Sequence, residues 1–162
     1  MHRAICGFQI DFSKEESWLL GIAGAAAIKI GRTAEGQKAR QELERRLLKA
    51  DGDQAKAGLA IMIAYLYFRS WKLKGGEVAW RNGGLHSNNR PTQEVQNLIA
   101  KAIEFTEQAY EAQLADLDSR LYALNLRLFY ITEGGTDAEF NQAEDLLGKL
   151  LEQRHNSGFW QY

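Results

Sequence analysis

One local pattern recurs three times along this chain. In each copy a strongly apolar segment of helix-forming composition ends at a glycine, and a more polar amphipathic segment follows it. The three copies cover residues 18–48, 57–114 and 121–151. A single helical hairpin of this kind cannot bury its own apolar face, whereas hairpins stacked side by side can. The pattern therefore predicts an all-α fold of three antiparallel hairpins.

Helix start and stop signals give the expected bounds of six helices. The helices are expected at 14–30, 34–50, 54–73, 92–114, 119–132 and 137–154. Residues 13–16 and 136–139 have the pattern of capping boxes, in which a hydroxyl and a carboxylate each bond the other residue's backbone amide. Gly31, Gly75 and Gly134 stand where the first helix of each hairpin must end.

The six expected helices differ in how far apolar residues surround them. The first, third and fifth are apolar almost all round, and such helices are usually buried between neighbours. We therefore expect the odd-numbered helices to form an inner layer and the even-numbered helices an outer one. On the fourth helix Glu104, Glu107 and Glu111 form a charged row opposite an apolar row. This row indicates the side of the helix that faces solvent.

Length and composition indicate one globular domain over residues 1–162, with 45% hydrophobic and 25% charged residues. The longest apolar runs, 18–28 and 57–68, are well short of the ~20 residues that span a bilayer, so we expect no membrane contact. The single cysteine, Cys6, excludes an internal disulfide and a cysteine-based zinc site. A cytoplasmic location is the expectation.

Two segments interrupt the regular pattern. The connection at 74–90 is rich in glycine and asparagine and exceeds the ~2–8 residues usual between packed helices. It is either a contact surface that includes Trp80, Arg81 and His86 or a flexible insertion. The aromatic tail at 159–162 either folds back on the last hairpin or marks the chain as a fragment of a larger protein. We favour the fragment interpretation.

Residues of the first and third hairpins resemble the tetratricopeptide repeat family. The matching positions are Ala23, Gly24, Ala26, Ala27, Gly31, Leu126, Tyr130, Gly134, Ala143 and Leu147. Arg127 departs from the family pattern because it occupies a small-residue position, and no unit has the closing proline. The resemblance implies a right-handed superhelix whose inner helices line a peptide-binding groove. A closed six-helix bundle is the structural alternative.

No group of residues has the spacing of a catalytic, metal or cofactor site. His2, His86 and His155 are far apart in the sequence, and no glycine-rich phosphate loop precedes a helix. We therefore expect neither enzymatic activity nor a metal or cofactor. The basic residues of the first hairpin are interleaved with glutamates and lack an aromatic stacking surface, so we expect no nucleic-acid binding.

The third helix carries the strongest candidate for a binding site. Tyr65, Arg69 and Lys72 are spaced i, i+4, i+7 and share one face of an otherwise apolar inner helix. A buried charge must be paired, so this face predicts a groove that binds a carboxylate or an acidic peptide. Asn125 and Arg127 of the fifth helix are expected to contribute. The alternative is that Arg69 pairs with an acidic residue of a neighbouring helix while Lys72 extends into solvent.

These features favour a non-enzymatic protein-interaction module that binds a partner protein or peptide along its inner helices. A helical sensor that binds a small ligand in a core cavity is the alternative. The distribution of charge raises a further possibility. Residues 1–102 carry 16 basic and 10 acidic residues, whereas residues 103–162 carry 4 basic and 11 acidic residues. Head-to-tail self-association through these halves is one interpretation, and an unevenly charged solvated surface is the other.

Overall fold

A computed structural model describes residues 11–76, 92–113 and 116–156 of the chain. Within these ranges the protein is all-helical, with six α-helices and no β-strand. The helices are α2 (Ser17–Lys29), α3 (Thr33–Lys49), α4 (Asp53–Leu73), α6 (Gln93–Ala112), α7 (Leu117–Gly134) and α8 (Asp137–Asn156). The all-α fold is confirmed, and every expected helix is present within three residues of its predicted bounds.

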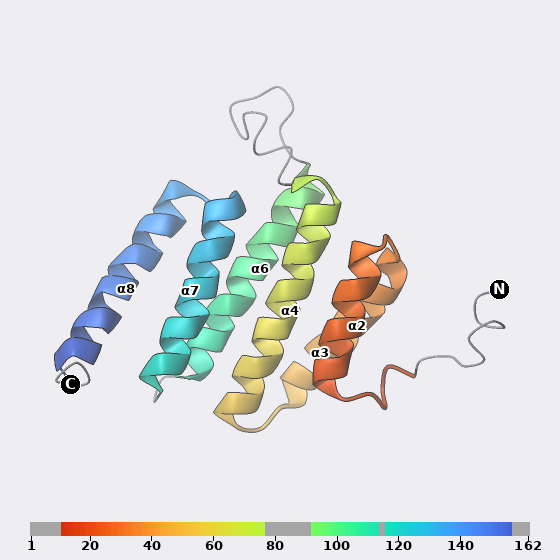
Figure 1. The fold of residues 1–162 in the computed structure, drawn as a ribbon, viewed down its shortest axis with the longest axis horizontal. Helices are drawn as coiled ribbons and strands as arrows, with labels where there is room; N and C mark the ends of the chain where they lie inside the picture. Colours follow the sequence, from red (N-terminus) through yellow and green to blue (C-terminus); the bar gives the residue numbers. More distant parts are fainter. Residues whose placement is uncertain (1–10, 77–91, 114–115, 157–162) are drawn as a thin grey trace.

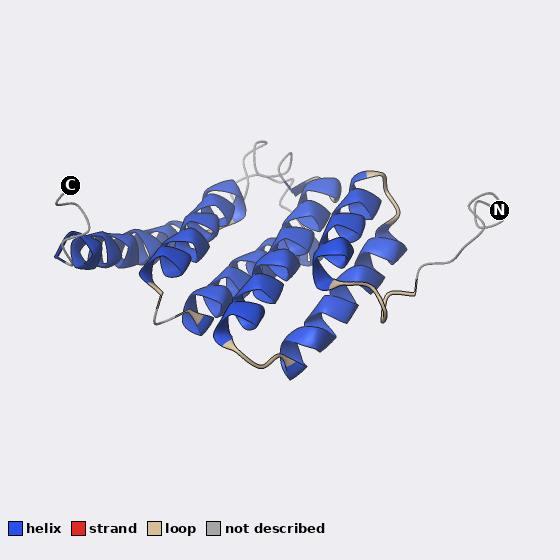
Figure 2. Ribbon diagram, turned by 60° about the horizontal axis from the view of Figure 1, so that its bottom comes forward, coloured by secondary structure: helices blue, strands red, loops and turns tan. Residues whose placement is uncertain are grey.

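The helices stand side by side as three antiparallel pairs, α2 with α3, α4 with α6 and α7 with α8 (Figure 1). The central helix α4 packs against α2, α3 and α6, and α6 also packs against α7. The first and last pairs therefore lie at opposite ends of an elongated row, which Figure 2 shows from a second direction. The right-handed superhelical path and the closed bundle both stay predictions.

One apolar core runs through the row and is centred on α4. Leu43 of α3, Leu66 of α4 and Leu124 of α7 are fully buried. Tyr67 of α4 stacks on Phe105 of α6 with ring centroids 5.7 Å apart, and its hydroxyl donates to Oε1 of Glu44 on α3 at 2.8 Å. This tyrosine therefore joins three helices. Burial and the Glu44 hydrogen bond raise its pKa to about 12.

The odd-numbered helices of the sequence prediction, α2, α4 and α7, are covered on only part of their circumference. Trp18 is 56% exposed, Tyr65 44% and Tyr122 56%. The expectation that helices apolar on every side are wholly buried is wrong here. A row gives each inner helix neighbours on some sides only, so one apolar side of each helix stays open to solvent.

The two expected capping boxes have different outcomes. At residues 136–139 the prediction is confirmed, because the Glu139 amide donates to Thr136 Oγ1 and the Thr136 amide donates to Glu139 Oε1, each at 3.2 Å. At residues 13–16 it is wrong, since α2 begins at Ser17 and its N-cap makes no side-chain hydrogen bond. Asp11 Oδ1 accepts instead from both the hydroxyl and the amide of Ser13, at 2.6 and 3.1 Å.

The three glycines predicted to end helices differ in backbone conformation. Gly31 and Gly75 adopt the left-handed backbone expected after a helix, with φ of 87° and 80°. α7 ends at Gly134 as predicted, but Gly134 does not adopt the left-handed conformation, so that part of the prediction is wrong. A Cβ on Gly134 would lie 2.9 Å from Cζ2 of Trp71 and 3.1 Å from Cγ1 of Ile99. Glycine is needed at this position for space.

Arg46 of α3 holds the segment before α2 against the first pair of helices. Its guanidinium donates to the Ser17 hydroxyl at 3.0 Å, to the Phe12 carbonyl at 3.1 Å and to Glu42 Oε1 at 3.0 Å. Hydrogen bonds from Arg45 and then Arg46 lower the pKa of Glu42 to about 2, although burial opposes the shift. The Glu42 carboxylate therefore stays ionised down to strongly acidic pH.

Two buried glycines let α2 and α3 approach closely. A Cβ on Gly24 would lie 3.1 Å from the Cβ of Ala39. A Cβ on Gly36 would overlap Cγ1 of Ile28 and lie 3.3 Å from the Gly24 carbonyl oxygen. Because the carbonyl belongs to a helix backbone, the added carbon has little room to be accommodated.

We expect Gly36→Ala to lower the free energy of unfolding by about 1–3 kcal/mol, the usual result of overpacking a buried contact. Gly148→Ala is the control, because nothing lies within 4 Å of a Cβ at that exposed position of α8. It should raise the free energy of unfolding by about 0.5–1 kcal/mol through helix propensity alone. Urea unfolding followed by circular dichroism measures both. Equal stabilisation by the two substitutions would contradict the close α2–α3 contact.

Candidate functional site

The open apolar sides of α2, α4 and α7 together line a surface groove of about 530 Å³, here called the inner groove. None of the described residues that line it is charged. The lining residues are Trp18, Gly21, Ile22 and Ala25 of α2, Ile61, Met62 and Tyr65 of α4, and Tyr122, Leu126 and Tyr130 of α7.

Helical periodicity explains why these side chains share one groove. On α2 the four lining residues are spaced i, i+3, i+4, i+7, and on α7 the three are spaced i, i+4, i+8, so each set forms one stripe. Gly21 contributes by its size, because a Cβ there would lie 3.1 Å from Sδ of Met62. The small residue allows α4 to approach α2 at the groove floor.

Several large apolar side chains of the inner groove face solvent. Trp18, Ile22, Tyr65 and Tyr122 are 44–61% exposed, and they come from all three helices. Contiguous exposed apolar surface of this kind is typical of a contact site for another molecule. Single exposed apolar residues are common on any protein, but here they gather on one groove.

An aromatic cluster sets how α7 lies against α4. Phe68 of α4 stacks on Tyr130 with ring centroids 4.8 Å apart, and it contacts Phe129 at 5.5 Å. Tyr130 is only 2% exposed and forms part of the groove floor. Burial raises its pKa above the ordinary value of 10, so this hydroxyl stays protonated near neutral pH. This part of the floor is therefore uncharged near neutral pH and packed within an aromatic cluster.

The structure separates the residues that the sequence grouped into one binding face. Tyr65 lies in the inner groove, and Arg69 and Lys72 follow it on the same face of α4, beyond the groove lining. Arg69 is partly buried and forms no ion pair with a described residue. The ammonium of Lys72 lies 5.6 Å from the centre of the Phe68 ring.

The other expected site residues lie elsewhere or outside the described ranges. Asn125 is exposed on α7 and does not line the inner groove. Arg127 does not line it either, and its buried Nε makes no hydrogen bond with the described residues. Trp80, Arg81 and His86 fall within 77–91, which the structure does not describe.

Sequence reasoning missed the exposed groove residues Trp18, Ile22 and Tyr122. The signal was present in the all-round apolar character of their helices, since a helix with neighbours on only some sides must expose part of such a surface. Apolar residues on every side of a helix do not by themselves imply burial on every side. Which sides stay open depends on where the neighbouring helices lie.

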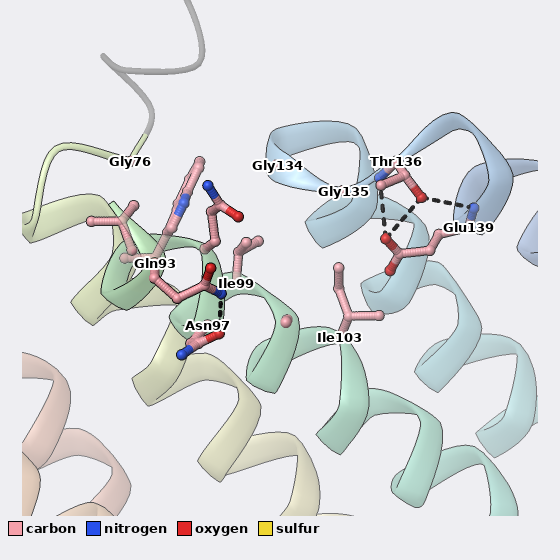
Figure 3. Close-up of a pocket in the computed structure, with 13 residues that line it drawn as sticks. Gly76, Gln93, Asn97, Ile99, Ile103, Gly134, Gly135, Thr136 and Glu139 are labelled. Atoms are coloured by element: carbon pink, nitrogen blue, oxygen red, sulfur yellow. Dashed lines mark hydrogen bonds between the residues drawn. The ribbon is translucent and has the colours of Figure 1, made fainter. Parts of the chain in front are cut away.

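A second, smaller hollow has a volume of about 220 Å³ and lies between the middle and last pairs, at one end of their helices (Figure 3). We call it the end hollow. It lies between Trp71 in the last turn of α4, Gly76 after that helix, the first turns of α6, and the turn between α7 and α8. Its polar groups largely bond one another. The Gln93 amide donates to Asn97 Oδ1 at 2.9 Å, and the Glu139 carboxylate is engaged in its capping box.

The described residues contain no group of three or more metal-binding side chains. Among the described helices, none combines the length and apolar character needed to cross a bilayer.

Comparison of the chain with family models, with curated proteins and with solved structures finds no match. The resemblance to tetratricopeptide repeats therefore stays a prediction.

We expect the inner groove to be dispensable for folding, because its outer side chains are already hydrated. Ile22→Ser and Tyr122→Ser should each change the free energy of unfolding by less than about 0.5–1 kcal/mol. Leu20→Ser, two residues away on α2 but 1% exposed, should lower it by about 2–5 kcal/mol. Urea unfolding compares the three variants. A loss for Ile22→Ser as large as that for Leu20→Ser would mean that the groove residues serve the fold.

Proposed function

We propose that this chain is a non-enzymatic protein-interaction module that holds a partner segment in the inner groove. The observation that carries the proposal is the gathering of exposed aromatic and aliphatic side chains from α2, α4 and α7 along one groove. An amphipathic helix or an extended peptide with large apolar residues fits a groove of this chemistry. We propose a cytoplasmic setting, as expected from the sequence.

The chemistry of the groove supports binding more than catalysis. Its ionisable side chains are those of Tyr65, Tyr122 and Tyr130. Burial raises the pKa of Tyr130, which keeps its hydroxyl from serving as a base near neutral pH. An acid–base mechanism usually needs two groups whose pKa values are shifted apart toward the working pH.

Charge beyond the groove specifies the partner further. Arg69 and Lys72 continue the face of Tyr65 along α4 toward its C-terminal end. We therefore propose that the bound segment has large apolar residues followed on one side by an acidic residue. The guanidinium of Arg69 is suited to a carboxylate because it can donate two parallel hydrogen bonds.

A small-ligand sensor is the second candidate, and the end hollow is the feature that favours it. Its volume of about 220 Å³ is below the roughly 300–1,000 Å³ usual for sites of drug-sized ligands. Much of its polar lining is already engaged in hydrogen bonds within the protein. We rank this candidate below the interaction module for these two reasons.

Selection from a displayed random-peptide library against the full chain tests the proposal. We expect the enriched peptides to combine large apolar residues with an acidic residue. Ile22→Ser should weaken binding of a synthesised peptide at least about tenfold in fluorescence anisotropy, as loss of a central apolar contact does. Ile30→Ser is the matched control, because Ile30 is 67% exposed at the end of α2 and does not line the groove. Equal affinity of both variants would overturn the assignment of the groove.

Arg69→Ala combined with Lys72→Ala should abolish capture of the acidic peptides while helical content stays unchanged. The reason is that the double substitution removes both cations from the end of the groove face. Lys38→Ala with Lys49→Ala is the control, since both lysines are exposed on α3. Circular dichroism checks folding and anisotropy measures affinity. Normal affinity of the folded Arg69/Lys72 variant would contradict the proposed acidic residue of the bound segment. The proposed apolar residues of that segment would be unaffected by this result.

A further inference from the structure

A separate hollow of about 940 Å³ opens where α3 passes into α4, and α6 forms its other wall. We call it the outer hollow. Its lining residues are Glu44, Leu47, Leu48 and Ala50 from α3 and its C-cap, Asp53 and Lys56 of α4, and Glu104, Phe105, Glu107, Gln108, Glu111 and Ala112 of α6. Apolar residues and carboxylates make up most of this surface.

The apolar part of the outer hollow contains an unusually exposed leucine. Leu48 is 89% exposed in the last turn of α3, the highest exposure of any large apolar residue that the structure describes. Beside it are Leu47, which is partly buried, and Phe105, which is 8% exposed. An exposed leucine on the wall of this hollow offers apolar area for a second molecule to cover.

The charged part of the outer hollow is acidic. Among the described residues that line it, five carry carboxylates and one, Lys56, is a cation. Glu104 pairs with Lys101 at 3.0 Å and Glu44 with Arg40 at 3.7 Å. Asp53, Glu107 and Glu111 are exposed and form no ion pair with the residues that the structure describes. The excess of negative charge therefore favours a cationic partner.

We propose that the outer hollow binds a basic amphipathic helix of a partner protein. The apolar side chains of the partner helix would cover Leu47, Leu48 and Phe105, and its lysines or arginines would face the carboxylates of the outer hollow. The geometry of α6 matches a helical partner, because Glu104, Glu107 and Glu111 form one stripe about 10 Å long. A helix lying along α6 can present basic residues at the same i, i+3, i+7 spacing.

This second surface is distinct from the inner groove. Tyr65 lines the inner groove, whereas Tyr67, about 200° further round α4, stacks on Phe105 of the outer hollow. The two partners would therefore bind on different sides of α4. The proposal concerns a function beyond the one assigned to the inner groove, and each stands without the other.

The probe for the test is a synthetic fluorescein-labelled helical peptide with leucines on one face and lysines at i, i+3, i+7 beside them. A peptide of the same composition in scrambled order is the first control. We expect the helical peptide to bind the full chain with an affinity that falls as salt concentration rises. The scrambled peptide should bind at least about tenfold more weakly, because it cannot cover the apolar residues and face the carboxylates at once. Equal affinity of the two peptides would overturn the proposal.

Charge reversal locates the binding surface. Glu107→Lys with Glu111→Lys should weaken binding at least about tenfold, since the substitutions place like charges together. Glu144→Lys with Glu152→Lys is the matched control, because it changes net charge equally at exposed positions of α8. Leu48→Ser should weaken binding about tenfold and leave the salt dependence unchanged. Equal losses in the α6 and α8 variants would overturn the proposal, because they would reflect net charge alone.

Two more measurements distinguish the outer hollow from the inner groove and from self-association. Ile22→Ser in the inner groove should leave affinity for the basic peptide unchanged, and a loss would assign the peptide to that groove instead. Light scattering of the unmodified chain should show a monomer at the concentrations used. A dimer that Glu107→Lys with Glu111→Lys dissociates would mean that a second copy fills the outer hollow, which would overturn the proposed partner.

Discussion

The packing of α4 is the constraint on which both candidate surfaces depend. Its successive residues Tyr67 and Phe68 contact opposite parts of the molecule. Tyr67 joins α4 to Glu44 of α3 and to Phe105 of α6. Phe68 joins it to Phe129 and Tyr130 of α7. Because large rings are buried on several sides of α4, displacing this helix would disturb both surfaces together.

The row-like arrangement explains why apolar surface stays exposed. In the observed row the first and last pairs lie at opposite ends, so no described helix of this chain covers the inner groove. Exposed rings such as Trp18 and Tyr122 have no role in the core. The proposed contact with another molecule would account for their exposure, which the packing of the core does not require.

Local sequence signals predicted the helices well and their ends less well. The capping box at residues 136–139 formed as expected because its two partners are close in sequence and bond each other directly. The one at residues 13–16 did not form, since Asp11 accepts from Ser13 and α2 starts later. The glycine at position 134 was read as a helix-ending residue with a left-handed backbone. In the structure a glycine is required there because Trp71 leaves no space for a side chain. Trp71 and Gly134 lie on helices far apart in the sequence, so this packing cannot be read from a single segment.

The sequence by itself determined that this chain is helical, where its helices lie, and that three of them are apolar on nearly every side. It also placed Tyr65, Arg69 and Lys72 on one face of α4, because helical periodicity alone sets that relation. Only the tertiary structure decided which apolar side of each helix is left in water. It placed Trp18, Ile22 and Tyr122 with Tyr65 in the inner groove, and it placed Leu48 among the carboxylates of α6. Exposure depends on which helices pack against one another, and residues far apart in the sequence set that packing.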